Sequence, residues 1–155
     1  LRGRLKGCED PARNDRQLAY LFAADRHDHL YNATDGIVPL TQRGFTVITT
    51  RYHFSSWAYN GRTPEDFEVI NRLNCDFPLP QVVVYLTVPL EVSLARLAKR
   101  DVREFYEKEE ELVRVAKNYE TLFANIPERV VRAESTGDPE AVAALIFDKV
   151  AGLLE

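Results

Sequence analysis

The segment that follows residue 50 carries the residue types best suited to bind a phosphorylated ligand. Arg51 comes directly after an apolar run, and Ser55, Ser56, Trp57 and Tyr59 follow it. A guanidinium can bind two phosphate oxygens at once, and serine hydroxyls can donate to phosphate or sugar oxygens. An alternative stays open, in which Arg51 is a surface residue at a strand end and the two rings belong to the core.

A second candidate site lies upstream, on a predicted helix. Phe22 and Arg26 are four residues apart and therefore share one face of that helix. An aromatic ring can stack on a nucleobase, and an arginine beside it can donate to a base carbonyl. Taken alone, the pair is better explained by a core phenylalanine and an arginine that reaches solvent.

Apolar segments of two kinds predict the elements that position these side chains. β-branched apolar runs predict strands at 45–50 and 82–88, the second of them buried on both faces, with a short third strand at 130–131. Helical spacing and proline-initiated starts predict helices over 15–30 and 107–123 and from Pro64, Pro89 and Pro139 onward. Helices that alternate with buried strands indicate an α/β fold with a parallel sheet. Ligands bind beyond the carboxyl ends of such strands, where Arg51 is expected.

The composition narrows the classes of protein to which the chain can belong. Its 155 residues are 45% hydrophobic and 28% charged, with a formal net charge of −4. This balance favours a single globular domain over residues 1–155 and argues against a nucleic-acid partner, which would require a basic surface. No apolar run approaches the roughly 20 residues of a membrane-spanning helix, so no membrane partner is expected.

The residues that could bind a metal are poorly spaced for that purpose. Cys8 and Cys75 have neither disulfide nor zinc spacing, and they predict thiols in a reducing, cytoplasmic compartment. His27 and His29 are two apart and point in different directions on a helix. We therefore expect no residues dedicated to a protein-bound metal.

Considered together, the residues of the two candidate sites resemble the motifs of one enzyme family in their order and spacing along the chain. The motifs that carry the resemblance are Phe22-Ala23-Ala24-Asp25-Arg26, Arg51-Tyr52, Ser55-Ser56 and Ala58-Tyr59-Asn60-Gly61. They resemble those of thymidylate kinases, as does the path from Pro78 through the run 82–88 into a helix that bears Arg96. The resemblance covers nearly all of the chain. It implies a P-loop nucleotide kinase-like fold, with a parallel sheet flanked by helices.

By this resemblance, the chain would bind dTMP as the acceptor of the γ-phosphoryl group of ATP, with Mg²⁺. Phe22 would stack on thymine, Arg26 would bind the base carbonyl, and Arg51 would hold the acceptor phosphate. Ser55 and Ser56 would line the base pocket, and the Tyr59 ring would pack against the sugar. The full set expected to bind dTMP is Phe22, Arg26, Arg51, Ser55, Ser56, Tyr59 and Asn60. The last of these stands where the family usually has glutamine.

The resemblance also assigns residues to the ATP side of the reaction. Arg100 would lie over the adenine, and Ala133 belongs to the same ATP-binding set. Arg96 and Arg103 would approach the transferring phosphate. Together with Arg51 they form the expected catalytic set. Residues 99–107 would form the lid. Such a reaction requires positioning and positive charge more than a covalent protein group.

Two departures from the family pattern bear on catalysis. The phosphate-binding loop G-x-x-x-x-G-K-[ST] does not occur in residues 1–155, and we expect the chain to be N-terminally incomplete, without the first strand and phosphate loop. Thr50 stands where the family has aspartate, and its hydroxyl carries no charge. Both departures favour one alternative, a non-catalytic nucleotide-binding or dimerisation module of kinase ancestry. A deoxynucleoside kinase is the other alternative, and Thr50 argues against it too, because those kinases have an acidic residue before the corresponding arginine. The resemblance also implies a homodimer.

Overall fold

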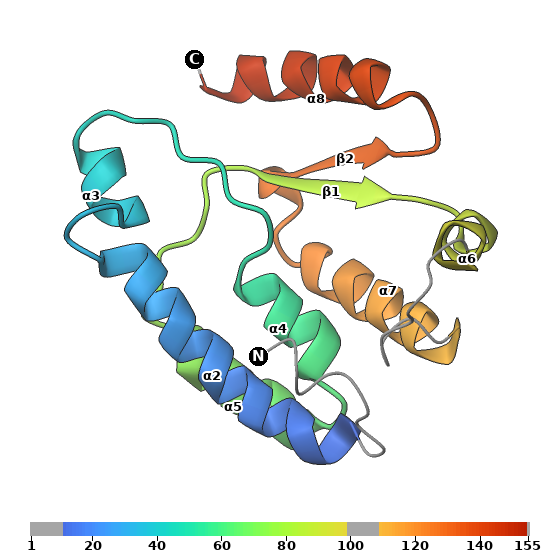
Figure 1. The fold of residues 1–155 in the computed structure, drawn as a ribbon, viewed down its shortest axis with the longest axis horizontal. Coiled ribbons are helices and arrows are strands. Elements are labelled where there is room, and N and C mark those ends of the chain that lie inside the picture. The colour runs from blue at the N-terminus through green and yellow to red at the C-terminus, as the bar shows by residue number, and fades with distance from the viewer. Residues whose placement is uncertain (1–10, 99–108, 155) are drawn as a thin grey trace. The chain divides into compact units, whose positions relative to one another are not determined.

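The computed structural model describes residues 11–98 and 109–154 (Figure 1). The chain divides into two compact units, residues 1–77 and 78–155. The described part of the first unit is helical, and that of the second contains a parallel sheet. None of the described helices is long and apolar enough to cross a membrane. The predicted lid, residues 99–107, lies outside the described residues.

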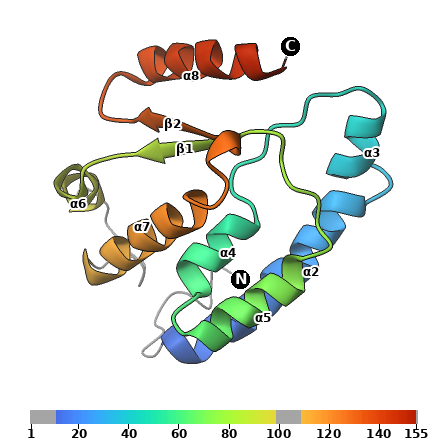
Figure 2. The same cartoon turned by 180° about the vertical axis from the view of Figure 1, so that it is seen from behind.

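The described residues of the first unit form α2 (Pro11–Tyr31), α3 (Ile37–Gln42), α4 (His53–Asn60) and α5 (Pro64–Asn74). α2 contacts each of the other three, and α4 contacts α5. Figures 1 and 2 show α2 and α5 running side by side. These helices bury a set of mostly aliphatic side chains: Leu18, Ala19, Ala23, Leu30, Phe54, Ala58 and Ile70. This packing holds the short helix α4 against two longer ones.

The start of α5 shows why the chain becomes helical at that point. Thr63 is the N-cap, and its hydroxyl accepts a hydrogen bond from the backbone N–H of Asp66 at 3.3 Å. The Asp66 carboxylate accepts one in return from the backbone N–H of Thr63 at 3.1 Å. Pro64 occupies the first helical position, where a missing N–H costs no helical hydrogen bond. The predicted helix start at Pro64 is confirmed.

In the second unit, β1 (Val83–Thr87) pairs in parallel with β2 (Val130–Glu134), with Val83 opposite Val130. β1 leads into α6 (Leu90–Ala98). α7 (Glu109–Phe123) and a short 3₁₀ turn (Pro127–Arg129) precede β2, and α8 (Pro139–Leu154) follows it. The two strands are therefore connected by a helical crossover, as parallel pairing requires.

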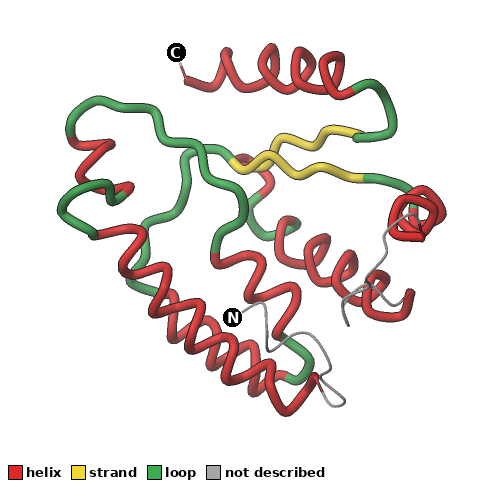
Figure 3. Tube along the Cα trace, in the orientation of Figure 1, coloured by secondary structure: helices red, strands yellow, loops and turns green. Residues whose placement is uncertain are grey.

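Helices cover both faces of this sheet. Successive strand residues point to opposite faces. The Tyr85 ring lies on the α7 side, 5.5 Å from the Tyr119 ring and 5.0 Å from the Phe123 ring between centroids. Val131 and Ala133 are buried, and β2 contacts α8. Figure 3 shows α7 and α8 on opposite sides of the two strands. The predicted α/β class, with a parallel sheet flanked by helices, is confirmed.

Two predictions about strands are wrong. Residues 45–50, predicted to form a strand, form none, and the segment is mostly exposed, with 91% of the Ile48 surface accessible. A strand requires a neighbour for its N–H and C=O groups, and β1 and β2 pair only with each other among the described residues. The run 82–88 was expected to be buried on both faces, yet Val84 and Leu86 in β1 are 39% and 51% exposed.

Candidate functional site

Arg26 is held by side chains from two other helices. It lies on α2, and its Nη1 donates to Oδ1 of Asn74, at the end of α5, at 2.5 Å. Its Nη2 donates to the Ser56 hydroxyl on α4 at 3.2 Å. The guanidinium also lies over the Tyr52 ring, 5.6 Å from the ring centroid. Burial lowers the pKa of Arg26 from its usual value, and the neighbouring Tyr52 opposes that effect. Even so, a guanidinium stays protonated at neutral pH.

Arg51 precedes α4 and has an unusual backbone conformation. Its φ of 70° lies in the left-handed region, which disfavours residues with a Cβ atom. Its exposed guanidinium lies 4.8 Å from the centroid of the Tyr59 ring, and Nη2 donates to the Tyr59 hydroxyl at 3.4 Å. The ring therefore orients a cationic group that remains accessible to solvent. Thr50, just before it, is exposed.

The remaining predicted residues on α4 divide between two faces of the helix. Ser55 and Tyr59 are half-buried and four residues apart, on the side on which Arg51 meets Tyr59. Ser56 and Asn60, also four apart, are each only 3% exposed. The face of α4 that carries Ser56 and Asn60 is therefore packed inside the protein. The face that carries Ser55 and Tyr59 is more exposed and lies near the Arg51 guanidinium.

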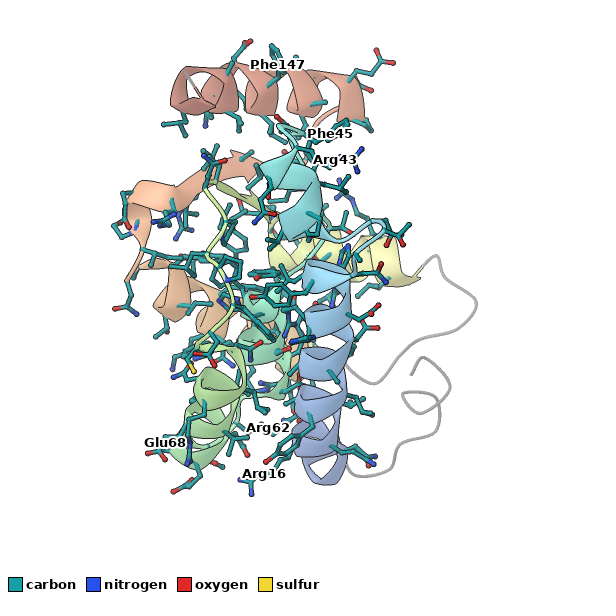
Figure 4. The ribbon with its side chains drawn as sticks, turned by 90° about the vertical axis from the view of Figure 1, so that its left-hand side faces the viewer. Arg16, Arg43, Phe45, Arg62, Glu68 and Phe147 are labelled. Atoms are coloured by element: carbon teal, nitrogen blue, oxygen red, sulfur yellow. The ribbon has the colours of Figure 1, made fainter. Side chains whose placement is uncertain are left out.

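Asn60 belongs to a buried polar cluster at the end of α4. Its Nδ2 donates to Oδ1 of Asp15 at 3.4 Å, and Arg62 Nε donates to the other oxygen of that carboxylate at 2.5 Å. Asp15 is 1% exposed. Figure 4 shows Arg62 beside the lower end of α2, near Arg16. A buried carboxylate needs such partners, so this cluster ties α2 to the end of α4.

Phe22 lies on α2 four residues before Arg26 and is half-buried. The structure thus brings Arg26 and Ser56 together, with Phe22 one turn from Arg26, and places Asn60 in a second cluster with Asp15 at the end of α4. Arg51, which meets Tyr59, lies on the exposed side of the same helix. The two candidate segments, separate in the sequence, meet at α4.

Sequence analysis missed two residues at this site. Asn74 is the buried acceptor for Arg26; its signal was a polar residue four positions after Ile70, on the apolar side of a helix. His53 opens α4, with its ring centroid 4.2 Å from that of Phe54. Among the described residues its Nδ1 has no hydrogen-bond partner. Burial, reinforced by the positive charge of Arg26, lowers the pKa of His53 to about 4.

The residues expected on the ATP side lie in the second unit or outside the described residues. Arg96 is exposed on α6 and donates to the Ser135 carbonyl oxygen at 2.8 Å. Ala133 is buried in β2. Arg100 and Arg103 lie outside the described residues. No cluster of three or more His, Cys, Asp or Glu side chains that could hold a metal occurs in residues 11–98 and 109–154.

Comparison with known proteins identifies a single family. The family model described as "Thymidylate kinase" matches residues 1–146. The chain is 40% identical over 111 residues to a putative thymidylate kinase of Treponema pallidum, covering 71% of this chain and 52% of that protein. It is 35% identical over 139 residues to a probable thymidylate kinase of Thermococcus gammatolerans, covering 88% and 65%. It is 33% identical over 127 residues to a thymidylate kinase of Akkermansia muciniphila, and the match covers 81% of this chain and 59% of that protein. The chain therefore spans between half and two thirds of the length of these relatives.

Proposed function

The chain belongs to the thymidylate kinase family, and from this we propose that the protein transfers the γ-phosphoryl group of ATP to dTMP, producing dTDP. One structural observation supports this proposal above the others. Two arginines from distant parts of the sequence are oriented by the same short helix, α4: Arg26 by Ser56 and Arg51 by Tyr59. A nucleoside monophosphate offers two features that an arginine can recognise, a base carbonyl and a phosphate.

On the base side, Arg26 is a partly buried cation with fixed hydrogen bonds, and Phe22 lies one helical turn away. A half-buried ring of this kind can stack on a pyrimidine, and the guanidinium can donate to a carbonyl oxygen on its edge. Ser55 and Ser56 then line the base pocket from α4. Ser56 acts there through Arg26, since its hydroxyl accepts from that guanidinium.

On the phosphate side, Arg51 presents an exposed guanidinium against Tyr59. A phosphate dianion that binds there is held in place and partly neutralised, and Tyr59 lies beside the sugar. Asn60, which anchors the end of α4 to Asp15, supports this arrangement from inside. The acceptor phosphate oxygen attacks the γ-phosphorus, and the bond to the β-phosphate oxygen breaks, releasing ADP. Positioning and positive charge carry most of this rate enhancement.

In the proposed reaction, Arg96 and Arg103 stabilise the charge that develops on the transferring group, and Arg100 and Ala133 bind ATP. Kinases of this type use ATP as its magnesium complex. Such a complex takes most of its ligands from phosphate oxygens and water, and we assign no residue of this chain to it. We further propose that the protein works as a homodimer in the cytoplasm.

A second candidate function is nucleotide binding without turnover. The observation that favours it is Thr50, an exposed and uncharged residue beside the candidate phosphate site. A hydroxyl cannot take the electrostatic role that a carboxylate would have at that position. A dTMP site could then persist in a protein that does not transfer phosphate.

One experiment separates these candidates. Isothermal titration with dTMP measures binding, and ADP release from ATP with dTMP, thymidine or deoxycytidine as acceptor measures transfer. The proposed function predicts dTMP binding together with ADP release that depends on dTMP. Binding without ADP release would support the non-catalytic module, and release with a nucleoside acceptor would support a deoxynucleoside kinase. Absence of dTMP binding would refute both the kinase and the module.

A further inference from the structure

Asn74 is a buried amide whose orientation is determined by two hydrogen bonds. Only 7% of its surface is exposed. Its Nδ2 donates to the Ile70 carbonyl oxygen, one turn back along α5, at 2.6 Å. A carbonyl oxygen can only accept, so the amide nitrogen must face Ile70 and Oδ1 must face the other way. That oxygen accepts the hydrogen bond from Arg26 at 2.5 Å.

The guanidinium of Arg26 retains donors for a ligand after these contacts. An arginine has five N–H groups in a fixed planar arrangement. One is directed to Asn74 and one to the Ser56 hydroxyl. Because the group is planar, two fixed bonds on different nitrogens define the directions of the three remaining N–H groups.

The two partners of Arg26 differ in how firmly they can orient it. The contact of Arg26 with the Ser56 hydroxyl oxygen is the longer one, at 3.2 Å. The Asn74 amide cannot rotate without losing its bond to Ile70, and its contact with Arg26 is shorter. Of these two partners, Asn74 therefore restricts the guanidinium more.

We propose that Asn74 is a positioning residue that gives the site its preference for a base with a carbonyl group at the edge facing Arg26. The inference rests on the proposed function, in which Arg26 binds that edge. A thymine offers a carbonyl oxygen there, and a cytosine offers an amino group, which repels an N–H donor. A guanidinium held in one orientation discriminates between the two, whereas a loosened one can turn away from the amino group and accommodate cytosine.

Two substitutions isolate the contact with Arg26. Asn74→Asp loses the donor to Ile70 and keeps an oxygen acceptor for Arg26, as a carboxylate that the guanidinium holds by a charge-assisted hydrogen bond, while Asn74→Leu keeps the branched shape and loses both contacts. Their difference therefore reports the charged acceptor as a whole. Asn71→Leu, an exposed position on the same helix, makes the same chemical change away from Arg26.

The measurement is the ratio of the dissociation constants for dCMP and dTMP, by isothermal titration, with the folded fraction of each variant checked by circular dichroism. We expect Asn74→Leu to lower this preference for dTMP by about tenfold, the scale of one hydrogen bond to a charged group. Asn74→Asp and Asn71→Leu should keep the preference of the unsubstituted protein. An unchanged preference in Asn74→Leu, or an equal loss of affinity for both nucleotides, would overturn the proposal.

A second measurement does not depend on a ligand. ¹⁵N NMR of the arginine side chains measures how fast the Arg26 guanidinium rotates, and we expect slow rotation in the unsubstituted protein and in Asn74→Asp, and faster rotation in Asn74→Leu. Equal rates in all three would contradict the positioning role even if a variant lost binding by unfolding locally. If the unsubstituted protein binds dTMP and dCMP equally, the proposed function fails in its choice of base, and the specificity role of Asn74 fails with it.

Discussion

At the scale of single residues, the proposed phosphate-binding role of Arg51 must be distinguished from the behaviour of an ordinary surface arginine. Arg43 provides a comparison, because it is also exposed and lies over an aromatic ring, with 5.2 Å between its guanidinium and the Phe45 centroid. Figure 4 shows Arg43 and Phe45 next to each other. Both arginines thus make a similar cation–π contact, and only Arg51 is placed in the proposed site.

We predict that Arg51→Ala weakens dTMP binding by about 1.5–3 kcal/mol, the scale of hydrogen bonds to a charged group. Arg43→Ala should leave dTMP affinity unchanged, because it removes the same side chain and the same kind of ring contact elsewhere. Isothermal titration of both variants tests this. Equal affinities for the two variants would show that Arg51 does not bind the phosphate.

His53 makes the stability of the fold depend on pH. Its pKa is about 4 in the folded protein, against 6.5 for an unperturbed histidine, because burial disfavours the charged form. Between these values the unfolded chain binds a proton at this position and the folded chain does not. Stability from this residue is therefore fully present above about pH 6.5 and is lost as the pH falls toward about 4.

We predict that His53→Phe removes this part of the pH dependence. The free energy of unfolding of the unsubstituted protein should fall relative to the variant by an amount on the order of 3 kcal/mol between these pH limits. Phenylalanine suits the position, because His53 packs against aromatic rings and its Nδ1 has no partner among the described residues. Urea unfolding across the pH range measures the difference, and His29→Gln, at an exposed histidine, is the control. Parallel curves for the unsubstituted protein and His53→Phe would contradict the prediction.

At the scale of the elements, the close approach of α4 to α5 depends on a glycine between them. A Cβ atom at Gly61 would meet the Phe67 ring and would lie 2.7 Å from the Trp57 carbonyl oxygen. The Trp57 and Phe67 rings are packed together, with 4.2 Å between their centroids. A side chain at Gly61 would push these rings apart and separate the helices that hold Ser56 and Asn74.

We predict that Gly61→Ala lowers the free energy of unfolding by about 1–3 kcal/mol, the usual cost of overpacking. Gly137→Ala is the matched control, because an added Cβ there meets nothing within 4 Å. Its stability should change by less than about 0.5 kcal/mol. Chemical denaturation of both variants makes the comparison, and equal stabilities would mean that the two rings shift without cost.

At the scale of the whole molecule, the described structure leaves a β-prone segment exposed. Residues 45–49 are rich in residues that favour strands but form none, and Ile48 is almost fully accessible. Other large apolar side chains are exposed as well, among them Phe147 on α8 at 72% (Figure 4). Unpaired extended segments of this kind tend to pair between molecules, and a net charge of −4 opposes this only weakly.

We predict that Ile48→Ser reduces self-association in concentrated solution, as measured by light scattering. The free energy of unfolding should change by less than about 0.5 kcal/mol, because the side chain makes little contact with the folded protein. Thr49→Ser is the control, since it alters the same exposed segment without removing a large apolar side chain. A similar change in scattering for both variants would show that Ile48 is not the cause.

The sequence by itself determined the features that depend on neighbouring residues. Capping residues and a proline set the start of α5, apolar spacing predicted α2, and β-branched runs predicted β1 and β2. The family was also predictable, because its motifs are short and ordered along the chain. Each of these signals operates within about one turn or one strand, where side-chain spacing and backbone geometry are directly related.

Only the tertiary structure decided the features that depend on distant partners. Residues 45–49 have strand-forming side chains, yet among the described residues no strand pairs with them. Arg26 and Asn74 are 48 residues apart, and nothing local indicates that they meet. Their contact depends on how α2 packs against α5, which is set by the side chains of the whole helical unit together. The direction of a guanidinium, and with it the proposed choice of base, is therefore a property of the packed helices.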